Sequence, residues 1–440
     1  MRVLYLVHQY LPRYVGGTEI YTHGLARRAV AAGFEVAVVA YHESPSPSVA
    51  DFGVVRRTYE GIPVREVHYN LSVAPDPARY EHENVFVGDL VRRELEDFRP
   101  EVVHVMHAMK LSGAALDACR ARGVPFIVTL CDFWFICPRH TLVRSDGRLC
   151  DGPAHRLDCV RCLHDTHGFV PRRSALLSER RLLRRMRRGR RRREREPAAL
   201  WRDLHAIRRR NRYLARRLLA ARRIIALSGF QKAVFVRNGL PAERVEVIEH
   251  GLEAAGLRPG LRRPGPVPRV VFIGSIVPDK GPHVLLEALA RIPTLAVECR
   301  IYGAVPGTAY GRHLAALAAA DPRVSLRGSF PPDGLGAVLA ETDLLAVPSV
   351  WYENSPLVVK AAFHVGVPVL ASRIGSLAEM VTPGRNGWLE VPGDPARWAA
   401  AIARLAADRA ALAVDPTPVK SMDENAREMF AIYASEAGRP

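Results

Sequence analysis

The sequence predicts an α/β protein with two doubly wound parallel-sheet domains. Short apolar runs that indicate buried strands alternate with helix-forming stretches along most of the chain, as in parallel sheets with helices on both faces. At 440 residues the chain is too long for a single hydrophobic core. The stretch 251–268 contains four Gly and four Pro, a composition typical of an interdomain linker.

Each half of the chain contains six expected strands. Those of the first half are 2–7, 35–40, 102–106, 126–130, 224–227 and 245–248, and those of the second are 269–273, 297–302, 324–326, 344–347, 367–371 and 387–391. We therefore expect a first domain over 1–255, a linker over 256–268, a second domain over 269–415, and a final helix within 416–440 that packs back on the first domain. Ligands of such sheets bind at the carboxyl ends of the strands, so the two domains are expected to face each other across one cleft.

Three stretches that follow expected strands carry candidate chemistry. Gly16-Gly17 lies between the first strand and its helix, where paired glycines let backbone N–H groups approach a phosphate. Lys280 lies in the loop 274–281, where its charge is placed to neutralise a diphosphate. Taken alone, each is also compatible with an ordinary turn or a solvated lysine.

The third stretch, 348–356, has the sequence PSVWYENSP and follows a buried strand. Ser355 is expected to cap a helix whose first residue is Pro356 and which ends at Gly366. Such a helix start directs free N–H groups and a positive dipole end at an anionic ligand, and Glu353 can accept hydroxyl protons from a sugar.

Together with HQYLPRYVGGTEIYTHGLARR at 8–28 and IGSLAEM at 374–380, these stretches resemble glycosyltransferase family 4, the retaining GT-B enzymes with two Rossmann-like domains. The resemblance implies that a sugar moves from a nucleoside diphosphate donor to an acceptor with retained configuration, and that the chemistry requires no metal cofactor. The catalytic positions that it implies are Glu353 and Lys280, with Cys131 near the transferred sugar. His107 is a further candidate from its place just after the third expected strand, where a histidine can line the acceptor side or be structural. The donor-binding positions are Gly16, Gly17, Gly274, Ser275, Lys280, Asn354, Ser355, Pro356, Leu357 and Ala361.

Three of these positions depart from the family pattern. Ala361 stands where the family has a second carboxylate that contacts the nucleotide ribose, and losing that bond costs about 1.5–3 kcal/mol of affinity. Cys131, in TLCDFW, replaces a histidine near the transferred sugar, and Ser275 replaces an arginine that assists the lysine. The departures keep open an alternative in which the protein is a catalytically impaired homologue that serves as a binding or partner subunit.

Four cysteines form the pattern C-x12-C-x8-C-x2-C within a predicted insert at 137–162. Cys137, Cys150, Cys159 and Cys162 fit a structural tetrahedral zinc site, with His140, His155 and His164 as spare ligands. Two disulfides or free thiols are the alternatives, and a reducing compartment favours metal over disulfides.

The net charge of +18 comes from a predicted helical segment, 172–223, which contains 22 Arg and four acidic residues. A basic amphipathic helix can bind an anionic membrane surface, bind nucleic acid through phosphates, or present a solvated face. We favour the membrane surface and regard nucleic acid as the least favoured partner, because no aromatic residue lies between Arg172 and Arg193 to stack on bases.

The sequence has no apolar run of 18 residues and no signal-peptide pattern, so we expect a cytoplasmic protein that works at the inner face of the membrane. The expected activity is retaining transfer of a sugar to a glycan or lipid-linked acceptor, in the synthesis of cell-surface polysaccharide or glycoconjugate.

Overall fold

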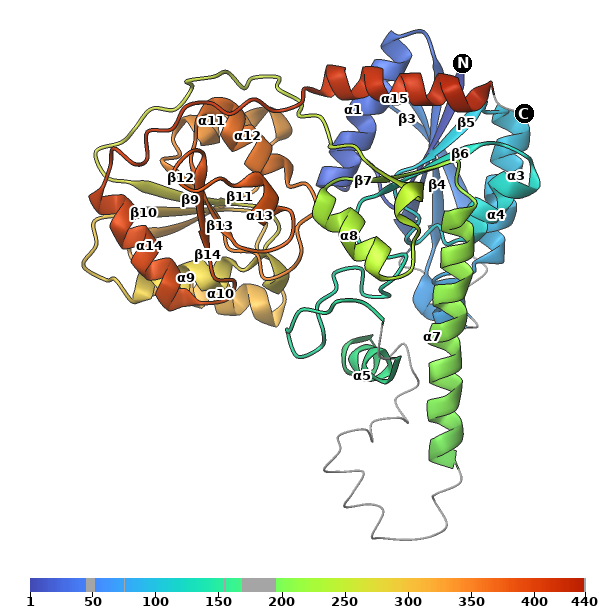
Figure 1. Cartoon of the computed structure of the whole chain (residues 1–440), viewed down its shortest axis with the longest axis horizontal. Coiled ribbons are helices and arrows are strands. Elements are labelled where there is room, and N and C mark those ends of the chain that lie inside the picture. The colour runs from blue at the N-terminus through green and yellow to red at the C-terminus, as the bar shows by residue number, and fades with distance from the viewer. Residues whose placement is uncertain (45–51, 75, 154–155, 168–194, 439–440) are drawn as a thin grey trace. The chain divides into compact units, whose positions relative to one another are not determined.

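The computed structural model describes residues 1–44, 52–74, 76–153, 156–167 and 195–438, which fold into two units (Figure 1). Unit 1 comprises the described residues of Met1–Leu227, Lys232–Ile248 and Ala426–Pro440. Unit 2 comprises Ser228–Gln231 and Glu249–Asn425. Of the expected basic segment 172–223, residues 172–194 lie outside the described residues.

Unit 1 is built on an eight-stranded sheet in the order β3-β4-β2-β1-β5-β6-β7-β8, in which every neighbouring pair except β3 and β4 is parallel. The strands are β1 (Arg2–Val7), β2 (Glu35–Glu43), β3 (Gly53–Tyr59), β4 (Ile62–Tyr69), β5 (Val102–Val105), β6 (Phe126–Leu130), β7 (Arg223–Ala226) and β8 (Val245–Val247). The helices wholly or mainly of this unit are α1 (Gly17–Ala31), α2 (Pro77–Tyr80), α3 (Val85–Phe98), α4 (Ala114–Ala121), α5 (Arg156–His167), α7 (Arg195–Leu219), α8 (Gly229–Arg237) and α15 (Met422–Ala437).

The hairpin of β3 and β4 was not predicted from the sequence. Its two-residue turn places both Glu60 and Gly61 in the left-handed region, with φ of 45° and 79°, which matches the twist of a hairpin. The side chains of β3 are mostly exposed or half-buried. Because β3 is an edge strand, it lacks the continuous apolar run that marks the buried parallel strands.

Unit 2 contains a six-stranded, fully parallel sheet in the order β11-β10-β9-β12-β13-β14. The strands are β9 (Arg269–Ile273), β10 (Glu298–Tyr302), β11 (Val324–Gly328), β12 (Leu344–Val347), β13 (Val369–Ser372) and β14 (Gly387–Glu390), and the helices are α9 (Pro282–Ala290), α10 (Ala309–Ala319), α11 (Leu335–Ala340), α12 (Leu357–Val365), α13 (Leu377–Met380) and α14 (Pro395–Ala407).

The sheet of unit 2 is covered on both faces, as the sequence predicted. One apolar core joins it to α9, α10 and α14, and a second joins it to α11, α12 and α13. The two helix layers lie on opposite sides of the strands in Figure 1. The fold-class prediction of two doubly wound parallel-sheet domains is confirmed.

Residues 256–268, expected to form a linker, pack on unit 2. Leu257 is buried in the core beside α11 and α12. Arg262 and Arg263 bond to groups of the same unit. This segment therefore belongs structurally to the second domain.

From Ala426 onward, the helix α15 belongs to unit 1. Tyr433 is fully buried, and its hydroxyl lies 2.6 Å from Nδ1 of His104. Glu436 accepts a hydrogen bond from Arg223 at 2.8 Å. No described helix is both long enough and apolar enough to cross a membrane.

The strand order reverses direction in the same way in each sheet. The chain moves from β1 outward to β2 on one side and later to β5 on the other, and from β9 to β10 on one side and later to β12 on the other. In doubly wound sheets, ligands bind at the carboxyl ends of the strands beside such a reversal. Ligand-binding residues are therefore expected in the loops after β1 and β5 of unit 1, and in the loops after β9 and β12 of unit 2.

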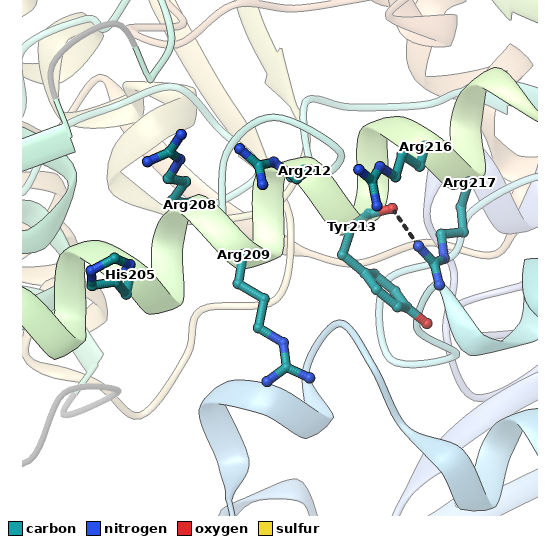
Figure 2. A pocket seen from close by; sticks show the side chains of 7 residues that line it. All are labelled: His205, Arg208, Arg209, Arg212, Tyr213, Arg216 and Arg217. Carbon is teal, nitrogen blue, oxygen red and sulfur yellow. Dashed lines mark hydrogen bonds between the residues drawn. The ribbon is translucent and has the colours of Figure 1, made fainter.

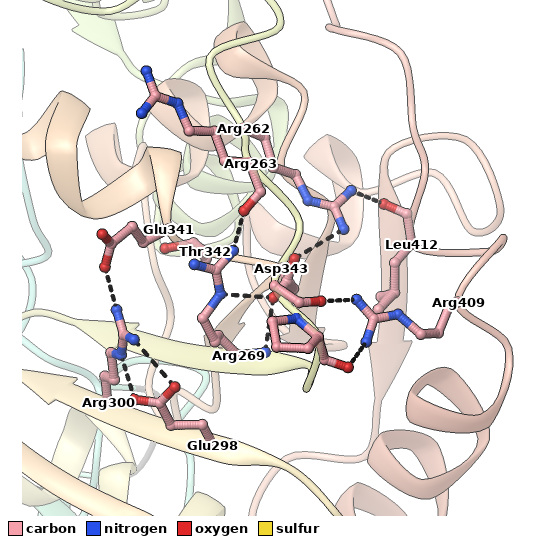
Figure 3. A network of polar contacts seen from close by, with 12 residues as sticks. Arg262, Arg263, Arg269, Glu298, Arg300, Glu341, Thr342, Asp343, Arg409 and Leu412 are labelled. Carbon is pink, nitrogen blue, oxygen red and sulfur yellow. Dashed lines mark hydrogen bonds and ion pairs between the residues drawn. The ribbon is translucent and has the colours of Figure 1, made fainter.

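At the opposite, amino end of β12, the buried carboxylate of Asp343 joins the segment before β9 to the sheet (Figure 3). It accepts hydrogen bonds from the backbone N–H and Nε of Arg269, both at 2.9 Å, and from Arg262 at 3.3 Å. Burial alone would raise the pKa of Asp343, but the hydrogen bonds from Arg269 and the charges of both arginines outweigh it and lower the pKa.

We expect Asp343→Asn to destabilise unit 2 by about 2 kcal/mol, because two largely but not fully buried guanidinium groups lose their counter-charge. The lowered pKa means that the carboxylate stabilises the fold above the ordinary aspartate pKa, and that this contribution is lost as the pH falls through the folded-state pKa. Thermal unfolding measured from neutral to acidic pH should therefore show a smaller difference between the two proteins at the acidic end. Glu341→Gln, which changes a 58% exposed partner of Arg300, is the control and should cost under about 1 kcal/mol. An equal loss in both variants would contradict the expectation.

Candidate functional site

In unit 2, the loops after β9 and β12 are in direct backbone contact. Gly281 has φ +67°, and a Cβ at this position would collide with the carbonyl oxygen of Pro348. The backbone N–H of Val350 donates to the carbonyl of Asp279 at 2.9 Å. Glycine is needed at 281 both for its backbone conformation and for this close approach. The two loops thus bring Lys280 close to the stretch 348–354.

The Lys280 ammonium and the Glu353 carboxylate form an ion pair, with Nζ 2.7 Å from Oε1 and 2.9 Å from Oε2. Glu353 also accepts hydrogen bonds from Ser349 Oγ at 2.7 Å and from Trp351 Nε1 at 2.9 Å. The side chain of Glu353 is 5% exposed, whereas that of Lys280 is 28% exposed and lies over the Trp351 ring. The carboxylate is therefore fixed in place, while the cation remains reachable from solvent. Ser349 and Trp351 were not predicted as site residues.

The helix that follows begins one residue later than predicted. Pro356 is the N-cap residue, with an extended backbone (φ −68°, ψ 111°), and α12 begins at Leu357 without a side-chain cap. The predicted cap by Ser355 is wrong, because the extended proline separates its hydroxyl from the first turn. The predicted end at Gly366 is confirmed by its φ of +82°.

The start of α12 therefore offers uncapped backbone N–H groups beside Glu353. The Ser355 and Ser376 hydroxyls are buried and make no hydrogen bond within the described chain. Ser376 adjoins the carboxylate loop, since its N–H donates to the carbonyl of Glu353 at 3.0 Å. Buried hydroxyls normally have partners, so these groups are suited to contact a ligand.

The remaining predicted donor positions differ in exposure. Ser275 is exposed in the loop after β9, and the N–H of Gly274 donates to Tyr302 at 3.0 Å. Asn354 is buried beside Glu353. Ala361, within α12, has no exposed surface and belongs to the apolar core between this helix and the sheet.

In unit 1, four ionisable side chains gather at the carboxyl ends of β1, β5 and β6. Nε2 of His8 lies 3.2 Å from Oε1 of Glu19, and Nε2 of His107 lies 2.7 Å from Oδ2 of Asp132. The two imidazole rings are 4.4 Å apart between centroids. The result is a carboxylate–imidazole–imidazole–carboxylate array in which His107 alone was predicted.

The hydrogen bonds of His107 assign its tautomer. The backbone N–H of Met109 donates to Nδ1 at 3.0 Å, so Nδ1 is an acceptor and the ring proton on Nε2 is donated to Asp132. Both ring nitrogens are thus engaged, and His107 orients the carboxylate. The other oxygen of Asp132 accepts from the backbone N–H of Trp134 at 2.8 Å.

Charge in this array is unevenly distributed. Burial alone would raise the pKa of Asp132, but His107 and then His140 outweigh it and lower the pKa to about 2, so this carboxylate is ionised. Burial lowers the pKa of His8 well below its usual range, so His8 is neutral near pH 7. Burial raises the pKa of Glu19. Asp132 is therefore the firmly anionic member.

The glycine loop before α1 contributes to the same array. Gly16 is the N-cap residue of α1 and Gly17 is its first residue. Glu19, three residues after the cap, is held by the backbone N–H of Gly16, and its carboxylate fills the space that a Cβ at Gly16 would take. The N–H of Gly16 thus already has an acceptor within the chain.

Cys131 shares a hydrogen bond with Thr18 and is a protonated thiol, because burial raises its pKa. A protonated thiol is a poor nucleophile and metal ligand. His104, on β5, has no exposed surface and contacts Tyr433 and Thr129, so its role is structural. A signal for the missed His8 and Asp132 was available, because they lie one and two residues after an apolar strand, at the ligand-binding edge of the sheet.

The cysteines predicted to bind zinc gather near one another. The pKa of the Cys159 thiol is raised to about 12, by burial and then by the charges of Cys137, Cys150 and Cys162. All four are free thiols. In the described ranges, however, no group of three or more His, Cys, Asp and Glu side chains is placed to hold a metal ion. His155 and the side chain of His164 lie outside those ranges, and the zinc site stays a prediction.

Comparison with known proteins identifies the family. The description "Glycosyltransferase Family 4" matches residues 15–255, and "Glycosyl transferases group 1" matches residues 267–408. Among curated relatives, D-inositol 3-phosphate glycosyltransferase of Corynebacterium efficiens is 34% identical over 185 residues, covering 38% of this chain and 43% of the relative. The Salinispora arenicola protein of the same name is 36% identical over 190 residues, covering 38% and 42%. The chain thus spans less than half the length of these relatives.

Solved structures resemble this fold along nearly the whole chain. Anabaena HepE in complex with UDP-glucose aligns over 99% of this chain and 97% of its own, with a TM-score of 0.60 and 19% identity. A glycosyltransferase from Rickettsia africae aligns over 100% and 99%, with a TM-score of 0.62 and 15% identity. At such identities the likeness shows the fold alone, which is that of the GT-B glycosyltransferases. Because the family description covers more than half of its residues, the chain belongs to glycosyltransferase family 4.

Proposed function

We propose that this protein transfers a sugar from a nucleoside diphosphate sugar to a saccharide or lipid-linked acceptor, with retention of the anomeric configuration. The observation that carries the proposal is the Lys280–Glu353 pair at the carboxyl ends of β9 and β12, beside the uncapped start of α12. The UDP-glucose bound to HepE, a protein of the same fold, supports a donor of this chemical class.

The partly exposed ammonium of Lys280 is suited to contact the diphosphate, since it can share its protons between Glu353 and a phosphate oxygen. The N–H groups at the start of α12 stabilise the charge that develops on the leaving phosphate. The carboxylate of Glu353 accepts four hydrogen bonds, three of them on Oε1 and one on Oε2. Oε2 is therefore the carboxylate oxygen that can still accept a hydrogen bond from a sugar hydroxyl. Retention follows if the leaving phosphate oxygen takes the acceptor proton on the same face of the sugar.

In unit 1, the ionised carboxylate of Asp132 is suited to bind a hydroxyl group. His107 and the N–H of Trp134 hold it in one orientation. We propose that it contacts a hydroxyl of the sugar or acceptor in place of the histidine that family members carry at position 131. Synthesis of cell-surface polysaccharide or glycoconjugate is the proposed context.

A second candidate function is that of a partner subunit without turnover. The burial of Ala361 in the core favours it, because no carboxylate is available there for the ribose. Transfer and donor-hydrolysis assays with a panel of UDP-, GDP- and ADP-sugars, combined with calorimetric titration of the free nucleotides, separate the two. Turnover with one donor supports the enzyme. Nucleotide binding without turnover supports the partner subunit, and absence of both would contradict a donor site in unit 2.

A further inference from the structure

The outward face of α7 carries a row of arginines. Arg208, Arg212 and Arg216 are spaced four residues apart, so they lie along one side of the helix, as Figure 2 shows. All three are exposed. Consecutive members are about 6 Å apart along the axis, as the rise of an α-helix dictates. We call these three residues the arginine row.

The inward and lateral arginines of the same helix are neutralised by carboxylates of unit 1. Arg209 pairs with Glu83 at 2.7 Å, Arg210 with Glu81 at 2.8 Å, and Arg217 with Asp117 at 3.0 Å. No residue of the arginine row forms an ion pair with any part of the chain that the structure describes. The arginines that attach α7 to unit 1 thus have carboxylate partners, whereas the positive charges of the arginine row have no such partner among the described residues.

The arginine row borders two adjoining hollows on the surface of unit 1. The first, of about 460 Å³, is lined by the row and by Tyr213 (Figure 2). The second, of about 380 Å³, is lined by Arg216 and by the exposed Arg120 of α4. Arg216 belongs to both, so the basic surface continues from α7 to α4. Guanidinium groups bind phosphate through paired hydrogen bonds, which makes such a surface a candidate phosphate site.

We propose that the arginine row and Arg120 bind the phosphate groups of an anionic lipid surface. The cations follow one line along an exposed helix face, which suits a plane of headgroups. Between Asp203 and Leu219, the part of α7 whose side chains the structure describes, there is no large exposed hydrophobic side chain, so attachment through this part of the helix is electrostatic. The inference stands independently of the proposed sugar transfer.

Nucleic acid fits this surface less well. Phosphate contacts would have to hold most of it, because base stacking needs exposed aromatic rings. His205 is the exposed ring that lines the first hollow, and it offers a single stacking position. Tyr213 also lines this hollow, but its ring is buried under Arg217, whose guanidinium carbon lies 3.6 Å from the ring centroid. Its hydroxyl donates to Asp117 at 2.9 Å. The Tyr213 ring is therefore packed within the protein and is not available to stack on a base.

The test compares the full-length protein with the triple variant Arg208→Gln, Arg212→Gln, Arg216→Gln in co-sedimentation with vesicles. One set contains phosphatidylcholine alone, and the other contains phosphatidylcholine with phosphatidylglycerol. The native protein should bind the anionic vesicles, and binding should weaken as salt increases. The triple variant should bind them roughly a hundredfold more weakly, since each basic residue near an anionic surface contributes about fivefold.

The matched control removes the same charge from exposed arginines of unit 2, through Arg291→Gln, Arg385→Gln and Arg397→Gln. It should retain most of the vesicle binding, and thermal unfolding should be nearly unchanged in both variants. Equal losses in the two variants, or no loss in the row variant, would overturn the proposal. So would tighter binding to single-stranded DNA than to anionic vesicles, or saturable pyrophosphate binding without vesicle binding.

Discussion

Replacing Lys280 with alanine is expected to lower nucleoside diphosphate affinity by roughly tenfold to a hundredfold, because a charge-assisted hydrogen bond to phosphate is lost. Turnover should fall further, by about 10² to 10³, since the same cation stabilises the leaving phosphate. Glu353→Gln should behave differently. It preserves the size of the side chain that Ser349 and Trp351 hold, so free nucleotide should bind within a few-fold of normal while turnover falls by about 10².

Calorimetric titration with nucleoside diphosphate, together with kcat and KM for the identified donor, distinguishes the two variants. Glu287→Gln, on α9 and outside the cluster, serves as the control and should change neither quantity. If Lys280→Ala and Glu353→Gln leave affinity and turnover intact, the ion pair is structural and the donor site lies elsewhere.

The second large effect is expected from Glu81→Gln in unit 1. The carboxylate of Glu81 is buried and accepts hydrogen bonds from Nε of Arg210 at 2.8 Å and from the Trp134 indole. Arg210, 4% exposed, also donates to the carbonyl of Trp134 at 2.8 Å. Removing the charge leaves a buried guanidinium without its counterion, which typically costs about 3–5 kcal/mol. We therefore expect thermal unfolding of unit 1 to shift down by roughly 10 °C.

Glu83→Gln provides a matched control two residues away. Glu83 pairs with Arg79 and Arg209, whose side chains are 45% and 57% exposed, so the change should cost under about 1 kcal/mol. The double variant Glu81→Met, Arg210→Met should recover much of the lost stability, because no unpaired charge remains. A Glu81→Gln protein as stable as Glu83→Gln would contradict this account.

The pH dependence of this buried pair follows from its pKa. Burial alone would raise the pKa of Glu81, but the charge and hydrogen bonds of Arg210 outweigh it and lower the pKa. The pair therefore stabilises unit 1 above the ordinary glutamate pKa, and this contribution is lost as the pH falls through the folded-state pKa. Because Trp134 lies two residues after Asp132, the pair also helps to position the candidate site.

Local patterns were sufficient for most of the architecture. The strands 2–7, 126–130, 269–273 and 344–347 were predicted with the bounds observed, since a buried parallel strand is an apolar run between turn residues. The hairpin of β3 and β4 was not predicted, because an exposed edge strand lacks such an apolar run. The helix after Glu353 starts one residue late, because the extended Pro356 takes the cap position.

By itself, the sequence determined the fold class and the candidate donor residues Lys280 and Glu353, because turn glycines, cap positions and strand periodicity are encoded within a few neighbouring residues. The tertiary structure alone revealed the array of His8, Glu19, His107 and Asp132, and the division of the arginines of α7 between paired and unpaired positions. Those contacts depend on sheet order and helix rotation. Glu81 and Arg210, for example, are 129 residues apart, and the local spacing of residues cannot predict a contact between positions so distant in the sequence.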